Sequence, residues 1–332
     1  MIRLPFTFVA ITLALAQAAV GQDQATTLLN AARAADVVVT AKVLAATDPS
    51  PEWHRLQLQT LQILKGQAPA TFTLLEPSGA CCGRSLFALQ IGDTRLMFLR
   101  RAGQALHPFG GSRGVVAAEP SIVAHVQALL ASQGQQELAH VLATCLAHDE
   151  TRIADDAAHA LATLPQLTLS HADRAAVVDA LLLASARGST RSAALVDVAV
   201  RVADDHVLDA LLPAYLQTER GDQAKLLRAG LCRCPSSAVA QRLTLFVHDD
   251  RAALRAAELL VLLPTLDAHS ALDRLLQPTT HPRVALCIAE GLLASGVPGE
   301  QLTSRVPAPV LALAERQRQQ PKRFRAINPQ RR

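Results

Sequence analysis

Aromatic side chains are scarce in this chain of 332 residues, which has one Trp, one Tyr and eight Phe. Half of the residues are hydrophobic all the same, and Ala and Leu dominate among them. Small aliphatic side chains favour closely packed helices, and a shortage of rings disfavours surfaces that bind nucleic acids by base stacking. We therefore expect a large aliphatic core, about two domains and no nucleic-acid partner.

Motifs of common enzyme sites are also missing. The 11 histidines form no His-Glu-x-x-His or His-x-x-x-His pair, and no Gly-rich loop ends in Lys-Ser or Lys-Thr. Such spacings place zinc ligands on one helix face or surround a phosphate with backbone amides. We also expect no Gly-x-Ser-x-Gly nucleophile elbow. The glycine-rich segment at 110–114 follows Pro108 and precedes a short apolar run, so we interpret it as a loop. The sequence predicts a protein without enzymatic activity.

The N-terminus, MIRLPFTFVAITLALAQAAVGQ, has one basic residue, Arg3, then an apolar run over residues 4–15 and then small residues. This order is typical of a secretory signal peptide, which we place at residues 1–21. A retained signal anchor is the alternative, although the run is shorter than the ~20 residues of a spanning helix. Only four of the 32 basic residues are Lys, which suggests a GC-rich bacterial genome. We expect a periplasmic or extracellular protein whose mature form has no transmembrane helix.

The C-terminal segment 316–332 carries seven basic residues and no acidic one, whereas the formal net charge of the whole chain is +4. The positive charge therefore belongs to this tail. We predict that the tail is disordered and solvated. The alternative is an electrostatic tether to an anionic component of the cell envelope.

Residues 22–120 have the hydrophobic pattern of a β-rich domain. Alternation between Leu56 and Leu58 slips in phase to Leu61, which indicates a β-bulge. A hairpin turn is expected at residues 101–104. The expected strands cover residues 36–46, 55–64, 71–75 and 95–100, with Leu96 and Phe98 on one face of the last and Met97 and Leu99 on the other. This pattern predicts a small all-β barrel or sandwich.

Four short segments in this region occur in a suggestive order: ADVVVTAKV, Ile63-Leu64-Lys65-Gly66, Cys82-Gly83, and Ile91-Gly92-Asp93 leading into RLMFLRR. Over residues 35–117 this order resembles the bacterial netrin-like domains related to tissue inhibitors of metalloproteinases. The resemblance implies an OB-like barrel. Inhibitors of that family chelate the protease zinc through an N-terminal Cys freed by signal cleavage, and here no Cys precedes Cys81. Protease inhibition is therefore not carried over.

From residue 121 the hydrophobic period becomes helical. Apolar stripes follow the helical repeat, as in Leu208, Leu211, Leu212, Tyr215 and Leu216. Four segments also resemble one another, with a polar start, an Arg and a Leu-rich end: 148–165, 188–204, 248–264 and 280–296. This spacing of roughly 30 to 45 residues resembles HEAT repeats, whose antiparallel helix pairs stack into a solenoid. We predict an all-α HEAT-like solenoid over residues 121–315, with an ordinary helical bundle as the alternative.

Four acidic pairs invite a metal-site interpretation: Asp149-Glu150, Asp155-Asp156, Asp204-Asp205 and Asp249-Asp250. All except Asp155-Asp156 lie where a helix is expected to begin. An Asp in that position accepts hydrogen bonds from free backbone NH groups and complements the helix dipole. We therefore expect helix capping.

The chain has six cysteines, and because we expect it to be exported, these cysteines can form disulfides. We expect Cys145 and Cys287 to be buried small hydrophobes. The other four form two close pairs, and they are candidates for disulfides or for inert structural thiols: Cys81, Cys82, Cys232 and Cys234. Six cysteines allow 15 pairings, among which sequence alone does not choose. Alternatively, these four thiolates bind Cu or Zn, although the pairs lie about 150 residues apart.

These features together predict a secreted, non-enzymatic protein-binding or scaffold protein of the bacterial envelope, without a cofactor. A small OB-like barrel and a HEAT-like solenoid both offer surface for a protein or peptide partner. The alternative is a soft-metal-binding or thiol-redox protein that uses Cys81 and Cys82.

Overall fold

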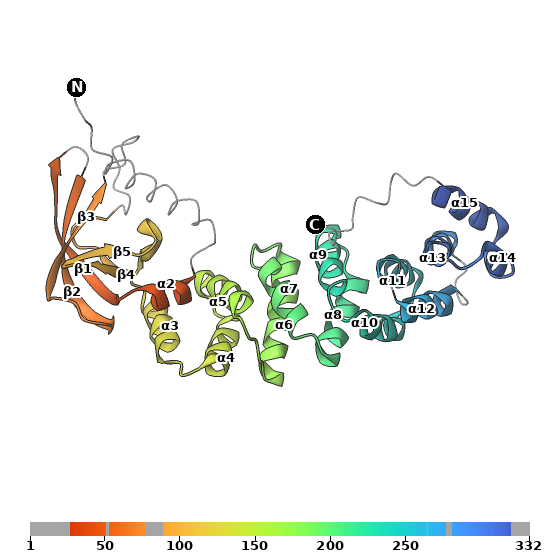
Figure 1. Ribbon diagram of the computed structural model, residues 1–332, viewed down its shortest axis with the longest axis horizontal. Coiled ribbons are helices and arrows are strands. Elements are labelled where there is room, and N and C mark those ends of the chain that lie inside the picture. The colour runs from red at the N-terminus through yellow and green to blue at the C-terminus, as the bar shows by residue number, and fades with distance from the viewer. Residues whose placement is uncertain (1–26, 51–52, 78–88, 264, 277–280, 320–332) are drawn as a thin grey trace, which may run out of the picture. The chain divides into compact units, whose positions relative to one another are not determined.

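The computed structural model describes residues 27–50, 53–77, 89–263, 265–276 and 281–319 (Figure 1). The chain divides into two compact units, one up to Thr163 and one from Leu164 on. Strands give way to helices between Ala117 and Pro120, close to the predicted boundary at residue 120. The first three helices after this boundary nevertheless group with the sheet, so the compact units divide later than the predicted domains.

The first unit contains a six-stranded antiparallel sheet with the order β3-β2-β1-β4-β5, in which β6 also pairs with β4. Strands β3 and β5 stand at opposite ends of this order and still contact each other, so the sheet is curled (Figure 1). The predicted β domain is confirmed as a curled antiparallel sheet. Its strands are β1 (Val37–Ser50), β2 (Trp53–Lys65), β3 (Thr71–Pro77), β4 (Thr94–Ala102), β5 (Ala105–Pro108) and β6 (Val115–Ala117).

Both faces of the central strands are buried. Met97 and Leu99 of β4 belong to the core cluster inside the curl, together with Val37 and Val39 of β1. Leu96 and Phe98 point to the other face and are also fully buried, and the helices α2 (Leu28–Ala34) and α3 (Pro120–Ala131) contact the sheet at β4 and β2. The predicted assignment of these β4 side chains to two faces is confirmed.

The predicted bulge in β2 is present. Thr40 of β1 pairs with Gln62, whereas its neighbour Ala41 pairs with Thr60, so Leu61 has no partner in the ladder. An extra residue of this kind reverses the facing of every side chain beyond it. The alternation of Leu56 and Leu58 therefore stops at this point, and Leu61 is half exposed at 51%.

Helix α2 was not expected from the sequence, and it explains two residues of the Ile63-Leu64-Lys65-Gly66 segment. The Lys65 ammonium donates hydrogen bonds of 2.7–2.9 Å to the carbonyl oxygens of Ala32, Arg33 and Ala35 at the C-terminal end of α2. These carbonyls have no partner within their own helix, and a cation also complements the helix dipole there. Gly66 follows with a φ of +73°, and a Cβ at this position would lie 2.2 Å from the carbonyl oxygen of Asp36.

Two further helices complete the first unit, α4 (Gln135–Cys145) and α5 (Thr151–Thr163), and α2, α3, α4 and α5 pack on one another. The second unit is helical throughout its described part. It contains α6 (His171–Arg187), α7 (Ser192–Arg201), α8 (Asp205–Gln217), α9 (Gly221–Leu231), α10 (Ser236–Leu243), the short 3-10 helix η2 (Thr244–Phe246), α11 (Asp250–Leu260), α12 (Leu266–Leu276), α13 (Pro282–Ala294), α14 (Gly299–Leu302) and α15 (Ala308–Gln319).

Helices of the second unit pack on neighbours two places along the chain as well as on adjacent ones. One series of contacts joins α6 to α8, α8 to α10 and α10 to α12, and another joins α7 to α9, α11 to α13 and α13 to α15. The look-alike segments 188–204, 248–264 and 280–296 contain α7, α11 and α13, which all belong to the second series. Within the described residues, α9 and α11 are the one neighbouring pair of this series that does not pack closely.

The helical region extends past the predicted end at residue 315, because α15 continues to Gln319 and includes Arg316 and Arg318. The rest of the predicted tail, residues 320–332, lies outside the described residues, as does the predicted signal peptide. In the part of the chain that the structure describes, no helix combines the length and the hydrophobicity that crossing a membrane requires.

Candidate functional site

The predicted metal or disulfide cysteines are placed only in part. Cys81 and Cys82 lie outside the described residues. Cys232 and Cys234 form the turn between α9 and α10 and carry free thiols. Burial raises the pKa of both, that of Cys234 to about 11, and the Cys234 thiol points to the carbonyl oxygen of Gly230 at 3.6 Å. These two thiols are therefore protonated at neutral pH, and thiolates are the form that binds soft metals.

Cys145 and Cys287 are partly buried and also carry free thiols. Burial raises the pKa of Cys287 to about 12, with Glu258 and Glu290 acting in the same direction. The predicted role of Cys287 as a small hydrophobe fits this environment. Among the described residues, no group of three or more His, Cys, Asp or Glu side chains is arranged to hold a metal ion.

Two of the four acidic pairs cap helices as predicted. Asp204 accepts a hydrogen bond of 3.0 Å from the amide of Val207 at the start of α8, and Asp249 accepts one of 2.7 Å from Ala252 at the start of α11. Asp156 has a different role. It is buried inside α5 and accepts a hydrogen bond of 2.5 Å from the backbone amide of Leu28 in the first turn of α2.

Asp156 belongs to a buried polar cluster that sequence reasoning missed. Cys145 Sγ of α4 lies 3.3 Å from Nδ1 of His125 in α3, and the opposite ring atom Nε2 lies 4.0 Å from Oδ2 of Asp156 in α5. With the Leu28 amide, each of the helices α2, α3, α4 and α5 contributes one group. The residues are 128 positions apart at the extremes, and no local pattern in the sequence indicates their meeting.

The order Cys, His, Asp is that of a thiol nucleophile with its base, but the local electrostatics oppose this use. Burial lowers the pKa of His125 to about 4, with His148 acting in the same direction, and burial raises the pKa of Cys145. Burial also raises the pKa of Asp156 to about 6. A thiolate next to an imidazolium needs the reverse shifts of the first two groups. The cluster therefore holds a neutral thiol and a neutral imidazole, and its evident effect is to join four helices.

The Ile91-Gly92-Asp93 segment also has a structural role. The Gly92 amide donates to the carbonyl oxygen of Val43, and the carboxylate of Asp93 accepts bonds of 3.1 Å from the Gln90 amide and 3.0 Å from Arg95. The bond from Gln90 and the Arg95 guanidinium hold the pKa of Asp93 below its usual value. This segment fixes the turn that leads into β4.

The expectation that the chain lacks a Gly-x-Ser-x-Gly elbow was wrong as to spacing, because residues 110–114, GGSRG, match it. An elbow is a sharp turn between a strand and a following helix. Here the segment forms a short 3-10 turn, η1 (Gly111–Gly114), between β5 and the strand β6. The backbone context of an elbow is therefore not met, and the interpretation as a loop fits.

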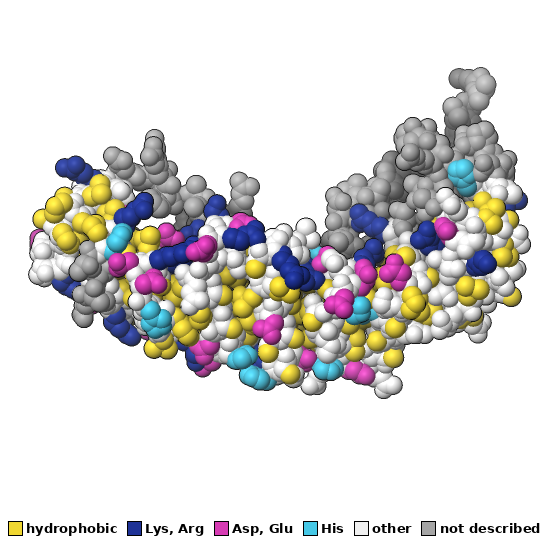
Figure 2. Space-filling view, turned by 180° about the vertical axis from the view of Figure 1, so that it is seen from behind, with side chains coloured by type: hydrophobic (Ala, Val, Ile, Leu, Met, Phe, Trp, Pro, Cys, Tyr) yellow, Lys and Arg dark blue, Asp and Glu magenta, His cyan; other side chains and the backbone are white. Residues whose placement is uncertain are grey.

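Arginines connect the helices of the second unit at a nearly constant separation. Each donates to a carboxylate or a backbone carbonyl 32 to 37 residues earlier in the chain. Figure 2 shows basic and acidic side chains interspersed over the helices. The donors are Arg201, Arg220, Arg233, Arg242, Arg251, Arg255 and Arg305.

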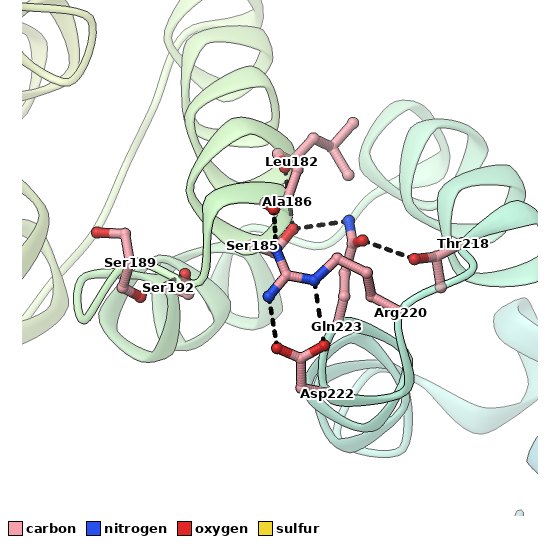
Figure 3. Close-up of polar contacts among 9 residues, drawn as sticks. All are labelled: Leu182, Ser185, Ala186, Ser189, Ser192, Thr218, Arg220, Asp222 and Gln223. Carbon is pink, nitrogen blue, oxygen red and sulfur yellow. Dashed lines mark hydrogen bonds and ion pairs between the residues drawn. The ribbon is translucent and has the colours of Figure 1, made fainter.

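One such connection is a polar network that joins α6 to α9 (Figure 3). Gln223 of α9 donates to the hydroxyl of Ser185 in α6 at 3.1 Å, and its amide oxygen accepts a bond of 2.6 Å from Thr218. Arg220 donates to the carbonyl oxygen of Ala186 while it pairs with Asp222 at 2.7 Å. Thr218 ends α8, so three helices meet in this network.

The network continues from Thr218 to α11. The carbonyl oxygen of Thr218 accepts two hydrogen bonds of 2.9 Å, one from Arg251 and one from Arg255. The backbone carbonyl of Arg255 in turn accepts a bond of 3.0 Å from the hydroxyl of the buried Tyr215. These contacts hold the two arginines of α11 beside the end of α8.

Between α9 and α11 lies a groove of about 320 Å³. Lys225 and Arg228 line it from α9, and Arg251, Arg255 and Glu258 line it from α11. Its apolar lining comes from Tyr215, Ala224 and Leu254. The groove lies where the second series of helices is spread apart, and we call it the α9–α11 groove.

A larger hollow of about 770 Å³ lies in the first unit between β3 and β5, the two ends of the strand order. Phe72 and Leu75 of β3 and Leu106 of β5 line it, with Arg101 at its side. Arg101 donates to the carbonyl oxygen of Gln67, which closes one end of the sheet.

No protein-family model matches the sequence, and no curated protein matches it either.

Proposed function

We propose that this chain is a secreted, non-enzymatic scaffold protein that binds a protein partner through its helical repeats. The observation that carries the proposal is the constant separation of the arginine contacts, 32 to 37 residues, between successive helices of the second unit. Contacts confined to neighbours one repeat apart are the signature of repeat proteins, in which each unit packs only on the next. This supports a HEAT-like solenoid over the helices from α6 to α15.

Solenoids present an extended surface, and binding is their usual task. Several large apolar side chains are exposed on the second unit, among them Leu245 at 65% and Leu266 at 83%. Contiguous exposed apolar patches mark contact surfaces, and η2 and α12, which carry these two leucines, contact each other. The two hollows described above are open grooves that offer a concave surface to a ligand.

The curled sheet supports a netrin-like, OB-like assignment of residues 35–117. Three features of the resemblance have a physical basis: Lys65 caps α2, Gly66 occupies a left-handed turn, and Asp93 fixes the entry to β4. Export rests on the N-terminal pattern of Arg3, an apolar run and small residues. N-terminal sequencing of the protein recovered from the cell envelope tests it, and an N-terminus that still includes residue 1 would contradict it.

In-cell photocrosslinking tests the binding function. A photoreactive amino acid replaces one exposed residue at a time, at Leu183, Leu245, Leu266 or Leu313 on the helices and at Leu61 on the sheet. We expect positions on neighbouring helices to give a covalent product with the same partner protein. Products that differ at every position, or a specific turnover activity of the purified chain, would contradict the proposal.

A further inference from the structure

The α9–α11 groove concentrates positive charge within a neutral helical unit. Residues 164–319 contain 16 basic and 16 acidic side chains, so their formal net charge is zero. Four basic side chains and one acidic side chain line the groove, which gives its lining a net charge of +3. A local excess of this kind, surrounded by mixed charges, attracts an anionic group to one place rather than to the whole surface.

The groove consists of two facing helix stripes. Ala224, Lys225 and Arg228 of α9 follow the spacing of one helix face, as do Arg251, Arg255 and Glu258 of α11. Each helix thus contributes two cations to the same opening. The opening exists because α9 and α11 do not pack closely, although their neighbours in the series do.

Three of the cations are held in place by contacts that leave donors available. Arg251 and Arg255 each donate from Nη2 to the Thr218 carbonyl, and Arg251 also pairs with Glu219 through Nη1 at 3.3 Å. A guanidinium has five NH donors, so both side chains keep unused ones. Arg228 lies 3.6 Å from Glu258, a separation too long for a short charged hydrogen bond. Lys225 is exposed and has no ion-pair partner among the residues that the structure describes. The groove therefore presents positioned NH groups that can still donate hydrogen bonds to a ligand.

We infer that the α9–α11 groove binds an acidic peptide segment of the partner protein, in which Asp or Glu carboxylates pair with Lys225, Arg251 and Arg255. This rests on the proposed binding function and names its site and ligand class. Guanidinium groups bind carboxylates with two parallel hydrogen bonds, and the apolar floor of Tyr215, Ala224 and Leu254 accommodates the methylene groups and backbone of a peptide.

Nucleic acid or another polyphosphate fits the groove less well. A polyphosphate needs a basic track along many residues, whereas the charge here is confined to one opening of about 320 Å³. The one ring among the described residues that line the groove, that of Tyr215, is buried and lies under Arg255 at 5.8 Å, so it offers no face for base stacking.

The test uses the full chain and a fluorescein-labelled 12-residue peptide of alternating Glu and Ala, with Gln in place of Glu as the matched peptide. We expect the Glu peptide to bind and the Gln peptide to bind at least tenfold more weakly. Lys225→Glu should weaken binding of the Glu peptide about tenfold, because reversing one exposed charge near the ligand changes the interaction by ~1.4 kcal/mol. Lys225→Arg should stay within twofold of the wild type.

Arg274→Glu is the control for charge itself, because Arg274 is exposed on α12 and does not line the groove. It should change binding less than twofold. Equal weakening by Lys225→Glu and Arg274→Glu, or equal binding of the Glu and Gln peptides, would overturn the inference. Tighter binding of a single-stranded oligonucleotide of equal charge would replace the peptide by a polyphosphate ligand and overturn it as well. If the peptide does not bind but photocrosslinks converge on another helix face, the groove is not the binding site, whereas the proposed binding function is supported.

Discussion

Arg255 Nη2 lies 2.9 Å from the carbonyl oxygen of Thr218, which is 37 residues earlier in the chain. This contact joins α11 to the end of α8. Thr218 also donates a hydrogen bond to Gln223, which in turn donates to Ser185 of α6. A charged donor on a backbone carbonyl at a helix end satisfies an acceptor that the helix itself leaves open. The same arrangement recurs between other successive helices, so the helices from α6 onward are connected by their arginines as well as by their aliphatic faces.

Removal of this donor should weaken the second unit. We expect Arg255→Met to lower the free energy of unfolding by about 1–2 kcal/mol, since it keeps the aliphatic stem and removes a partly exposed charged hydrogen bond. Urea denaturation followed by circular dichroism measures the change. Arg274 is exposed and makes no hydrogen bond or ion pair with the described part of the chain, so Arg274→Met should change the free energy by less than about 0.5 kcal/mol. Equal effects at the two positions would contradict a specific role of the Thr218 carbonyl.

Lys65 should stabilise the first unit for the same reason, because it also donates to backbone carbonyls at a helix end. Lys65→Met removes three hydrogen bonds to the end of α2, and we expect a loss of about 1–2 kcal/mol in the free energy of unfolding. Lys42 on β1 is exposed and serves as the matched control, because Lys42→Met removes an ammonium without removing such bonds. Hydrogen exchange gives a second readout, since the amides of α2 should lose protection in Lys65→Met only.

Alanine substitutions at Gly66 and Gly103 should distinguish the cost of a left-handed backbone from the cost of a steric clash. Both have a left-handed φ, +73° and +63°, but only a Cβ at position 66 meets another atom, the Asp36 carbonyl oxygen at 2.2 Å. Gly103→Ala should cost about 1 kcal/mol for the backbone conformation alone. Gly66→Ala should cost about 3 kcal/mol or more. Thermal denaturation of the two variants provides the comparison, and similar costs would show that the close approach of Asp36 is not a constraint.

The buried cluster predicts a specific pH dependence. The pKa of His125 is about 4 in the folded chain against 6.5 for an exposed histidine, so between pH 6.5 and pH 4 the unfolded chain binds more protons and acidification destabilises the fold. Asp156 acts in the opposite direction. Its pKa is about 6 in the folded chain against 3.8, so its contribution to stability is present below pH 3.8 and is lost as the pH rises through 6.

Two variants resolve these opposed contributions. Between pH 7 and pH 4.5, His125→Gln should lose about 2 kcal/mol less stability than the wild type, because its side chain no longer titrates. Asp156→Asn should lose more stability than the wild type over the same interval, because the stabilising protonation of the carboxyl is gone. Urea denaturation at the two pH values gives these differences. Parallel curves for the wild type and His125→Gln would show that His125 titrates normally.

The cysteines of the described chain should react slowly. Burial raises the pKa of Cys145, Cys232, Cys234 and Cys287, so few of these thiols are ionised at pH 7.5. We expect them to react with a thiol reagent within minutes in denaturant and much more slowly in the native protein. Intact mass before and after labelling counts them and also reports the state of Cys81 and Cys82. A stoichiometric Cu or Zn ion that is lost in the double variant Cys81→Ser, Cys82→Ser would favour the metal-binding alternative.

Many of the strands and helices of this fold could be predicted from local sequence patterns. The bulge at Leu61, the two faces of β4 and the apolar stripe of α8 all follow from side-chain periodicity, which depends only on neighbours in sequence. Helix α2 escaped prediction because its seven residues are few for a periodic signal. The tertiary contact that stabilises it, Lys65, is more than 30 positions away.

The candidate site was less accessible to sequence reasoning. The α9–α11 groove depends on which two helices fail to pack, and no single segment contains that information. The meeting of His125, Cys145 and Asp156 likewise depends on three helix orientations at once. The two cysteine pairs were noticed because their members are adjacent or nearly adjacent in the sequence. The basic side chains of the groove come from two separate helices, so their proximity is not apparent from the sequence.

Identification of the partner at position 225 is the most direct test of the proposed function. A photoreactive amino acid at position 225 is crosslinked in the cells that export the protein, and mass spectrometry then identifies the joined peptide, with position 274 as the reference. We expect one partner protein from position 225, joined within or beside a run of Asp and Glu residues, and no such product from position 274. The same products from both positions, or attachment to many unrelated proteins, would contradict a binding scaffold whose groove holds an acidic segment.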